Sequence, residues 1–333
     1  MENTLLEVKD LSVSFYRKKK EGQAVRDVSF TLKEGQTLGI IGESGSGKSV
    51  TGMTVMGLLP SIGGVIKGGE ILYEGKDLLK IGSRDMRKIQ GNRIAMIFQE
   101  PMTSLNPVFT IGYQICESLQ LHMGMSKEAA APKAVELLRT VGISSPEKRL
   151  KQYPHQLSGG MRQRVMIAIA LACEPNILIA DEPTTALDVT VQAQILQLLR
   201  ELKSNREKSA VILVTHDMGV IAENTDRVAV MYAGQIVEES DVIPLFRKPL
   251  HPYSEGLMAS MPSLTEHQEE LETIEGTVPS IYAMPLGCAF CARCKYARPC
   301  CETTAPRMLE AEPGRQVRCL RYDEKYREAW NDE

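Results

Sequence analysis

The sequence lacks an excess of basic residues and has no apolar run long enough to cross a membrane. Its net charge is -3 and its pI is about 6.1, so it has no overall positive field to hold nucleic acid through counterion release. The longest apolar run, Val165 to Cys173, is about half of the roughly 18 residues that a spanning helix needs. No N-terminal stretch resembles a signal peptide, because charged residues follow Leu5 and Leu6 at once. We therefore expect a soluble chain that binds no nucleic acid and contacts a membrane only through a partner.

Cysteine is scarce in the body of the chain, where only Cys116 and Cys173 occur. The rest of the eight cysteines lie between Cys288 and Cys319. Without an export signal the compartment is expected to be reducing, and there clustered thiols hold a metal more often than they pair with each other. The cysteines therefore predict a local site rather than a disulfide framework.

Length and periodicity predict an α/β chain with one large domain and an appendage. Short apolar runs alternate with amphipathic helical stretches, which is typical of a mainly parallel, buried sheet. We expect a domain over 1–255, with a helical subdomain at about 101–165, and a small irregular extension over 256–333. The predicted strands are Thr37–Ile41, Arg93–Phe98, Ile177–Ala180 and Val211–Thr215. The predicted helices are Glu128–Val141, with Pro132 near its first turn, and a crossover helix carrying Val191, Ile195, Leu198, Leu199 and Leu202 on one face.

The segment Gly42–Ser49 reads GESGSGKS and matches the phosphate-loop pattern G-x-x-x-x-G-K-[ST] directly after a predicted strand. Its glycines let backbone N–H groups turn inward around phosphate oxygens, at the positive end of a helix that begins near Lys48. Lys48 is expected to reach the β- and γ-phosphates, and Ser49 to offer an oxygen to Mg²⁺. The alternative is a glycine-rich turn that happens to contain lysine. The predicted ATP-binding residues here are Gly42, Ser44, Gly45, Gly47, Lys48, Ser49 and Val50.

Two acidic residues follow another predicted strand of the same sheet. The apolar strand that starts at Ile177 ends in Asp181 and Glu182. Adjacent residues at a strand end point in different directions, so the two carboxylates can hold distinct roles. Asp181 is suited to the surroundings of Mg²⁺, and Glu182 to polarising an attacking water as a general base. The alternative is a strand end with exposed acids and no chemistry.

The segment Leu157–Arg164, LSGGMRQR, resembles the signature sequence of ATP-binding cassette proteins and lies just before the Asp181 strand, as that family requires. The resemblance implies a P-loop NTPase cassette with an antiparallel β subdomain. Ser158 and Gly160 are then expected at a second helix N-terminus that closes over the ATP held by an opposite cassette. That cassette would be an identical chain or a paralogue. One chain would supply half of each active site.

Other residues resemble the remaining motifs of this family in the correct order. Gln99 resembles the Q-loop residue, which also contacts Mg²⁺, and Ala186-Leu187-Asp188 resembles the D-loop. His216 resembles the switch histidine at the γ-phosphate, the alternative being a buried histidine that only packs. Phe15 occupies the place of the aromatic residue that stacks on adenine, with Tyr16 as a substitute. The resemblance thus implies Glu182, His216 and Gln99 as catalytic residues.

Within this family the chain resembles the peptide-importer branch. The resemblance rests on Gln99–Pro107, on Tyr153–Arg164 and on His251-Pro252-Tyr253 followed by a short tail. It implies a peripheral ATPase on the cytoplasmic face of the membrane that works with two transmembrane permease subunits, served by an extracytoplasmic substrate-binding protein. Di- and oligopeptides are the expected cargo. A nickel importer, and a soluble cassette machine outside transport, are the alternatives.

Cys288, Cys294, Cys301 and Cys319 form a C-x5-C-x6-C-x17-C series. Four thiolates suit either a [4Fe–4S] cluster or tetrahedral Zn²⁺ by count, and the peptide-importer ATPases that this tail resembles carry an iron–sulfur cluster on such a series. Cys288, Cys291 and Cys294 also form a compact ligand set, so the roles of Cys291 and Cys300 stay open. Free or oxidised thiols without metal are the remaining alternative.

Overall fold

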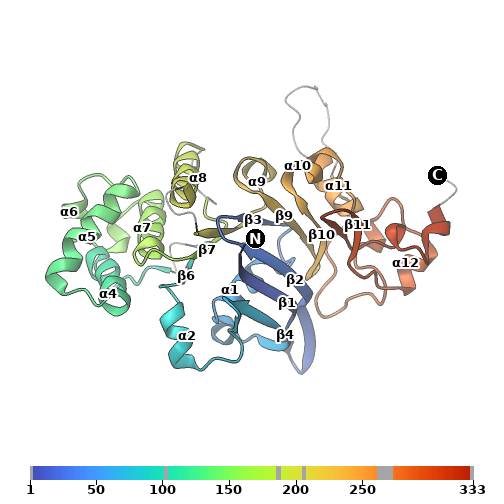
Figure 1. Cartoon of the computed structure of the whole chain (residues 1–333), viewed down its shortest axis with the longest axis horizontal. Helices are drawn as coiled ribbons and strands as arrows, with labels where there is room; N and C mark the ends of the chain where they lie inside the picture. The colour runs from blue at the N-terminus through green and yellow to red at the C-terminus, as the bar shows by residue number, and fades with distance from the viewer. Residues whose placement is uncertain (1–2, 101–103, 185–188, 205–207, 261–272, 331–333) are drawn as a thin grey trace. The chain divides into compact units, whose positions relative to one another are not determined.

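The computed structural model describes residues 3–100, 104–184, 189–204, 208–260 and 273–330 (Figure 1). By its internal contacts the chain divides into two compact units. Unit 1 comprises Met1–Leu5, Lys33–Gln36 and Leu78–Val214. Unit 2 comprises Leu6–Leu32, Thr37–Asp77 and Thr215–Glu333. The two units are described separately below.

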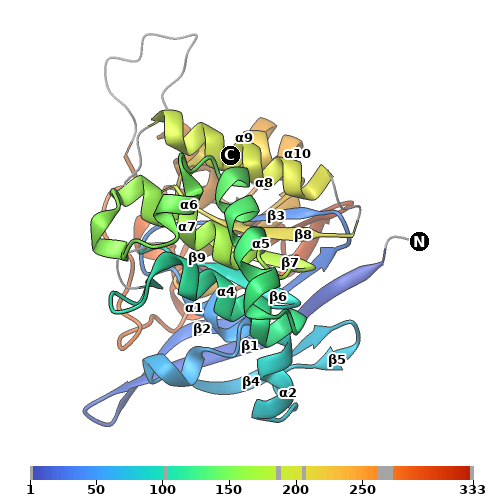
Figure 2. The ribbon, with the colours of Figure 1, turned by 90° about the vertical axis from the view of Figure 1, so that its left-hand side faces the viewer.

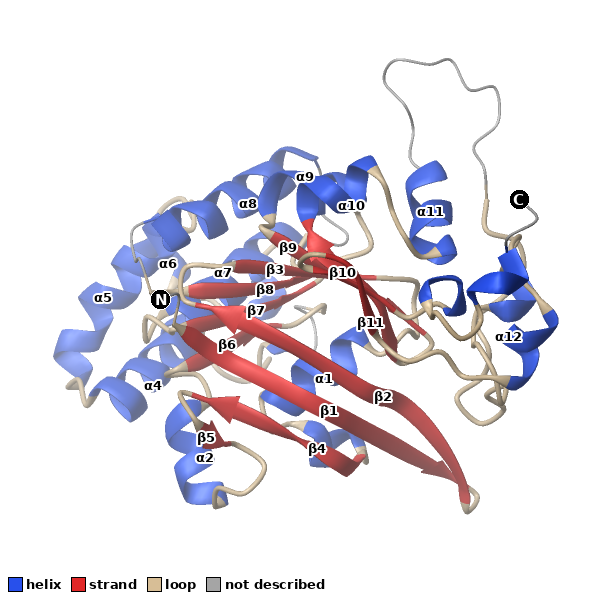
Figure 3. Cartoon of the chain, turned by 45° about the vertical axis from the view of Figure 1, so that its right-hand side comes forward, coloured by secondary structure: helices blue, strands red, loops and turns tan. Residues whose placement is uncertain are grey.

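The N-terminal part of unit 2 is a long antiparallel sheet, the β subdomain that the family resemblance predicts (Figure 3). Its strand order is β2-β1-β4-β5, and β1 pairs with β4 so that Leu6 lies opposite Tyr73. Buried and exposed side chains alternate along β2, as a half-buried strand requires. The strands are β1 Thr4–Arg17, β2 Lys20–Lys33, β4 Val65–Tyr73 and β5 Lys76–Asp77.

The second group of strands in unit 2 has the order β11-β12-β10-β9-β3. Strands β3 and β9 are parallel, with Ile41 opposite Val230, while β10, β11 and β12 add in antiparallel fashion. The sheet is therefore mixed in this unit, and two strands of the predicted extension join it. The strands are β3 Thr37–Ile41, β9 Arg227–Tyr232, β10 Gln235–Asp241, β11 Leu309–Glu312 and β12 Arg315–Val317.

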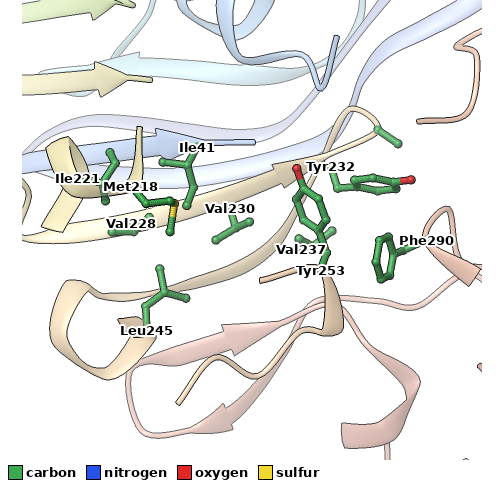
Figure 4. Close-up of a cluster of buried hydrophobic side chains, with 11 residues drawn as sticks. Ile41, Met218, Ile221, Val228, Val230, Tyr232, Val237, Leu245, Tyr253 and Phe290 are labelled. Carbon is green, nitrogen blue, oxygen red and sulfur yellow. The ribbon is translucent and has the colours of Figure 1, made fainter. Parts of the chain in front are cut away.

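Short helices complete unit 2 around one apolar cluster. This cluster contains Ile41 at the end of β3 and the aromatic residues Tyr232, Tyr253 and Phe290, so β3 and the C-terminal segment contribute to one core (Figure 4). The helices are α1 Lys48–Val55, α9 Met218–Asn224, α10 Val242–Arg247, α11 Pro252–Ala259 and α12 Pro299–Thr303; the 3-10 turns are η1 Leu59–Ile62, η3 Cys291–Arg293, η4 Leu320–Tyr322 and η5 Arg327–Trp330.

Unit 1 contains three parallel strands in the order β8-β7-β6, and all of their residues are buried. Burial on both faces explains why these strands read as continuous apolar runs. They are β6 Ile94–Ile97, β7 Ile177–Asp181 and β8 Ala210–Val214. The four predicted strands are thus confirmed. Thr37–Ile41 has the predicted bounds, and the ends of the other three strands differ from the predicted ones by at most one residue.

Helices fill the rest of unit 1, where the predicted helical insertion is confirmed (Figure 2). Pro132 lies further inside its helix than predicted, because Ser126 caps the helix and starts it at Lys127. The crossover helix buries Ile195, Leu198 and Leu199, as predicted. Its Leu202 side chain lies outside the described residues. The helices are α2 Ser83–Ile89, α4 Ile111–Met123, α5 Lys127–Thr140, α6 Pro146–Arg149, α7 Gly159–Leu171 and α8 Val189–Ser204, with a 3-10 turn η2 Pro154–Gln156.

Among the helices of the described ranges, none combines the length and the apolar character needed to cross a bilayer.

Candidate functional site: a nucleotide-binding loop and its acidic partners

The loop Gly42–Ser49 needs its glycines for conformation and for space. Gly42 has a φ of +150°, and a Cβ there would lie 2.0 Å from the Met231 carbonyl oxygen. Gly47 has a φ of +101°, and a Cβ there would meet the Ala24 carbonyl oxygen at 2.6 Å. No side chain caps helix α1, which begins directly after Gly47. The N-terminus of α1 therefore offers backbone N–H groups to an anion.

Lys48 lies inside the loop that it follows. Its side chain is buried, and its Nζ donates to the carbonyl oxygens of Gly42 at 2.7 Å and Glu43 at 3.0 Å. These bonds hold a positive charge where phosphate oxygens are expected. Of the other predicted loop residues, Ser44 and Gly45 are exposed, and Ser49 and Val50 are half-buried.

His216 lies in unit 2 next to the strand that leads into this loop. The preceding Thr215 donates its N–H to the Ile40 carbonyl oxygen at 3.2 Å, near the end of β3. The next residue, Asp217, caps α9 through its Oδ1. His216 itself is exposed, which excludes the alternative of a buried packing histidine and leaves its ring accessible to a ligand.

The two candidate adenine-stacking residues differ in their surroundings. Phe15 is half-buried in β1, close enough to the Gly63-Gly64 turn that a Cβ on Gly64 would lie 3.2 Å from its ring. Tyr16 is exposed, and Lys67 both donates to its hydroxyl and lies 5.0 Å from its ring centroid. One face of the Tyr16 ring is therefore occupied by a cation, which favours Phe15 as the stacking residue.

In unit 1 the structure brings Gln99 and Glu182 together. Gln99 Nε2 donates to Glu182 Oε2 at 2.9 Å, although the two residues are far apart in sequence. Glu182 has a φ of +46°, and its N–H donates to the Val214 carbonyl oxygen at 2.8 Å. Asp181, at the end of β7, is only 2% exposed. Carboxylate and amide oxygens are ligands that Mg²⁺ accepts, so Asp181 and Gln99 have the donor chemistry for this ion.

The signature segment begins α7. Ser158 is the N-cap, and its Oγ accepts from the Met161 N–H at 3.3 Å. Ser158 is exposed and Gly160 half-buried, so the N-terminus of α7 is accessible to solvent. The predicted D-loop Ala186-Leu187-Asp188 lies outside the described residues.

The C-terminal cysteines converge in unit 2. Five of them line one small cavity, and all eight cysteines of the chain are free thiols. Burial raises the pKa of Cys288 to about 11 and that of Cys319 to about 12, so both thiols hold their protons at neutral pH. Within the described residues, no three His, Cys, Asp or Glu side chains have the spacing of a single-metal site. The cysteines on the cavity are Cys288, Cys291, Cys294, Cys301 and Cys319.

Comparison with known proteins identifies the family. One family model, described as ABC transporter, matches residues 25–185, and another, described as the C-terminal region of oligopeptide/dipeptide transporters, matches residues 237–301. The oligopeptide transport ATP-binding protein AppD of Bacillus subtilis is 52% identical over 97% of this chain and 98% of its own length. The dipeptide transport ATP-binding protein DppD of Escherichia coli is 46% identical over 95% of this chain and 96% of its own.

The chain belongs to the ABC transporter ATP-binding proteins.

The solved structure of another ATP-binding cassette has a similar fold. The ATP-binding cassette MJ0796, in a dimeric post-hydrolysis state bound to ADP and Pi, is 29% identical with a TM-score of 0.65 over 71% of this chain and 98% of that one. As an ABC ATPase, this chain binds and hydrolyses ATP.

Sequence reasoning missed one residue of the ABC ATPase. Gln163, inside the signature, is 2% exposed, and its Nε2 donates to the Pro183 carbonyl oxygen at 2.8 Å. It thus ties helix α7 to the residue that follows Glu182. The available signal was a polar side chain placed among the apolar residues of a buried helix.

Proposed function

We propose that this chain is the ATP-hydrolysing subunit of an ABC importer that brings di- and oligopeptides into the cell. The observation that carries the proposal is the identity of about half along nearly the whole chain to proteins named for oligopeptide and dipeptide transport. The match to the C-terminal region of oligopeptide/dipeptide transporters supports it, because residues 237–301 do not overlap the ABC transporter match over 25–185.

The proposed chemistry is in-line attack of water on the γ-phosphate of ATP. Lys48 and the loop N–H groups bind the phosphates, and His216 contacts the γ-phosphate. Glu182 takes a proton from the attacking water, while Gln99, which donates to Glu182 at 2.9 Å, holds that carboxylate in place. Phe15 stacks on adenine. Ser49, Gln99 and Asp181 would hold Mg²⁺, which supplies charge neutralisation at the phosphates.

A second cassette completes the site. The N-terminus of α7, with Ser158 and Gly160, closes over the ATP bound by the opposite subunit. Because each cassette supplies this element to its partner, hydrolysis requires two cassettes. The partner is a second copy or a paralogue.

The helical insertion is the proposed contact with two transmembrane permease subunits, which hold the chain peripherally on the cytoplasmic face. Val108 is 70% exposed and Leu121 is 74% exposed. Phe109 and Tyr113 stack with ring centroids 4.5 Å apart and are also exposed. Clustered apolar side chains on a surface are typical of a protein interface. An extracytoplasmic binding protein delivers the cargo to the permease.

The Cys-rich extension over 256–333, which follows the proposed cassette domain over 1–255, is a proposed metal centre. Cys288, Cys294, Cys301 and Cys319 line the same cavity and have the donor chemistry of a [4Fe–4S] cluster. Such a group would pin an extension that has little core of its own. Zn²⁺ on the same thiolates is the alternative.

Affinity purification of the chain from its own membranes tests the assembly, and reconstitution of the purified complex tests the cargo. We expect two membrane subunits to copurify and labelled dipeptides or oligopeptides to enter vesicles only with ATP. Uptake of Ni²⁺ instead of peptide would show that the chain serves a nickel importer. If the chain is isolated without membrane subunits and still hydrolyses ATP, a soluble cassette ATPase outside transport would be favoured.

A further inference from the structure

The second residue of the phosphate loop, Glu43, is bound by the C-terminal region through its side chain. Arg293 Nη1 lies 3.0 Å from Glu43 Oε1 and 3.1 Å from Oε2. The Arg293 side chain is 6% exposed and that of Glu43 is 31% exposed. An ion pair shielded to this degree is screened less than a surface pair, so it can hold the loop.

The backbone of Glu43 is held as well. Its N–H donates to the Tyr253 hydroxyl at 2.8 Å, and its carbonyl oxygen accepts from Lys48 Nζ at 3.0 Å. One residue thus connects Tyr253 and Arg293 to the lysine that is expected to bind phosphate. The sequence alone indicated no contact between the phosphate loop and Tyr253 or Arg293.

Both contacting groups are fixed by their own surroundings. Tyr253 is fully buried, with its ring centroid 4.7 Å from that of Tyr232 and 5.5 Å from that of Phe290 (Figure 4). Arg293 donates through Nε to the Glu275 carbonyl oxygen at 2.8 Å and through Nη2 to that of Ile274 at 3.1 Å. The guanidinium therefore has little freedom, and it presents Nη1 to the loop.

We propose that Arg293 and Tyr253 are positioning residues for ATP binding, which they control through Glu43. The proposal rests on the proposed function in that ATP binds to Gly42–Ser49. A carboxylate beside a triphosphate repels it, and Arg293 neutralises that carboxylate. Arg293 lies between Cys291 and Cys294, so the Cys-rich segment and the ATP site are joined by one side chain.

Binding of a fluorescent ATP analogue to purified variants tests the inference. We expect Arg293→Gln to weaken binding about tenfold, since it removes a charge-assisted hydrogen bond and leaves Glu43 uncompensated. Glu43→Gln should stay within about threefold of wild type, and in that background Arg293→Gln should add nothing. In ATPase assays the loss should fall on KM and leave kcat within about threefold, because Glu182 is unchanged. Tyr253→Phe, which removes a single oxygen, should also raise KM.

Arg298→Gln is the matched control, because Arg298 lies in the same segment and donates to the carbonyl oxygens of Ala329 and Ala297. It should bind ATP as wild type does, with Arg293→Gln and Arg298→Gln melting at similar temperatures. Equal weakening by Arg293→Gln in the wild-type and Glu43→Gln backgrounds, or no weakening at all, would overturn the inference while leaving the proposed ATP site intact. Failure of the wild type to bind ATP would overturn both.

Discussion

Glu182 has a backbone and a side chain that are both held by neighbours. Its φ of +46° is unusual for a residue with a Cβ and costs of order 1–3 kcal/mol, and Gln99 holds its carboxylate. We predict that Glu182→Gln binds ATP with unchanged affinity but loses at least about a hundredfold in turnover, because a positioned general base is gone. Steady-state phosphate release and analogue binding measure the two effects.

The same variant should accumulate as a two-cassette assembly with ATP on size-exclusion chromatography. Glu223→Gln, an exposed acid on α9, serves as a control that should match wild type. Lys48→Ala should bind no ATP and form no assembly. Turnover of Glu182→Gln within about threefold of wild type would show that another group is the base.

At the residue level, the sequence predicts what is local and misses what is distant. The glycines of Gly42–Ser49 are required by the loop itself, so their pattern is readable without a structure. The contact between Arg293 and Glu43 joins residues that are 250 positions apart, and no periodicity or motif encodes it. Such contacts depend on how the elements pack.

The signature helix α7 is coupled to the loop after β7 by one buried amide. Replacing Gln163 with Leu leaves the Pro183 carbonyl oxygen without this donor, at a cost of about 1–3 kcal/mol. We predict about tenfold slower ATP turnover with ATP affinity within about twofold, because Pro183 follows Glu182 and the phosphate loop is not touched. Gln197→Leu, on the exposed face of α8, is the control. Normal turnover in Gln163→Leu would contradict the coupling.

The pairing of β10 with β12 contains a buried ion pair. Glu238 is fully buried, 3.2 Å from Arg315, and it accepts the N–H groups of Leu250 and His251 at 2.9 and 2.8 Å. Burial raises the pKa of Glu238 above its ordinary value, while the two N–H groups and Arg315 oppose that rise. We predict that Arg315→Gln lowers the free energy of unfolding by about 3 kcal/mol near neutral pH, since it leaves a buried charge unpaired.

The pH dependence of this loss has a definite sign. Without Arg315 the pKa of Glu238 in the folded state rises further above its value in the unfolded chain. The stabilisation that the protonated Glu238 gives to the folded state is fully present below the unfolded-state pKa. It is lost as the pH rises through the folded-state pKa. Urea unfolding should therefore show a larger deficit for Arg315→Gln at about pH 7.5 than at about pH 5. Lys248→Gln removes an exposed pair with Glu312 and should cost less than about 1 kcal/mol at both pH values. A pH-independent deficit would contradict the prediction.

Among the elements, buried strands were predicted best. The predicted run Ile177–Ala180 is apolar throughout and is followed by Asp181 and Glu182, so the strand and its end are readable to within one residue. Strands β11 and β12 were not predicted, because both are short and they join the sheet only where β12 pairs with β10. Strand β10 is distant from them in sequence, so no local pattern indicates this pairing.

At the level of the whole molecule, the extension shares its core with the cassette. Phe290 contacts Tyr232 and Tyr253 within one cluster, and Arg293 reaches the phosphate loop. A substitution that loosens the cysteine segment is therefore expected to alter ATP binding, because these residues connect that segment to the phosphate loop. The proposed metal centre would thus support ATP binding as well as local order.

The proposed metal centre can be tested by the colour and the metal content of the protein. Anaerobically purified protein is expected to be brown and to contain iron and acid-labile sulfide, and Cys319→Ser should lose both, because Cys319 lines the shared cavity. Cys173→Ser, which changes a buried thiol outside that cavity, should keep them. The loss should also lower the midpoint of thermal unfolding, since a group that binds only the folded state stabilises it. Stoichiometric zinc in place of iron would assign the site to Zn²⁺, and colourless metal-free protein with an unchanged melting temperature in Cys319→Ser would refute a metal centre.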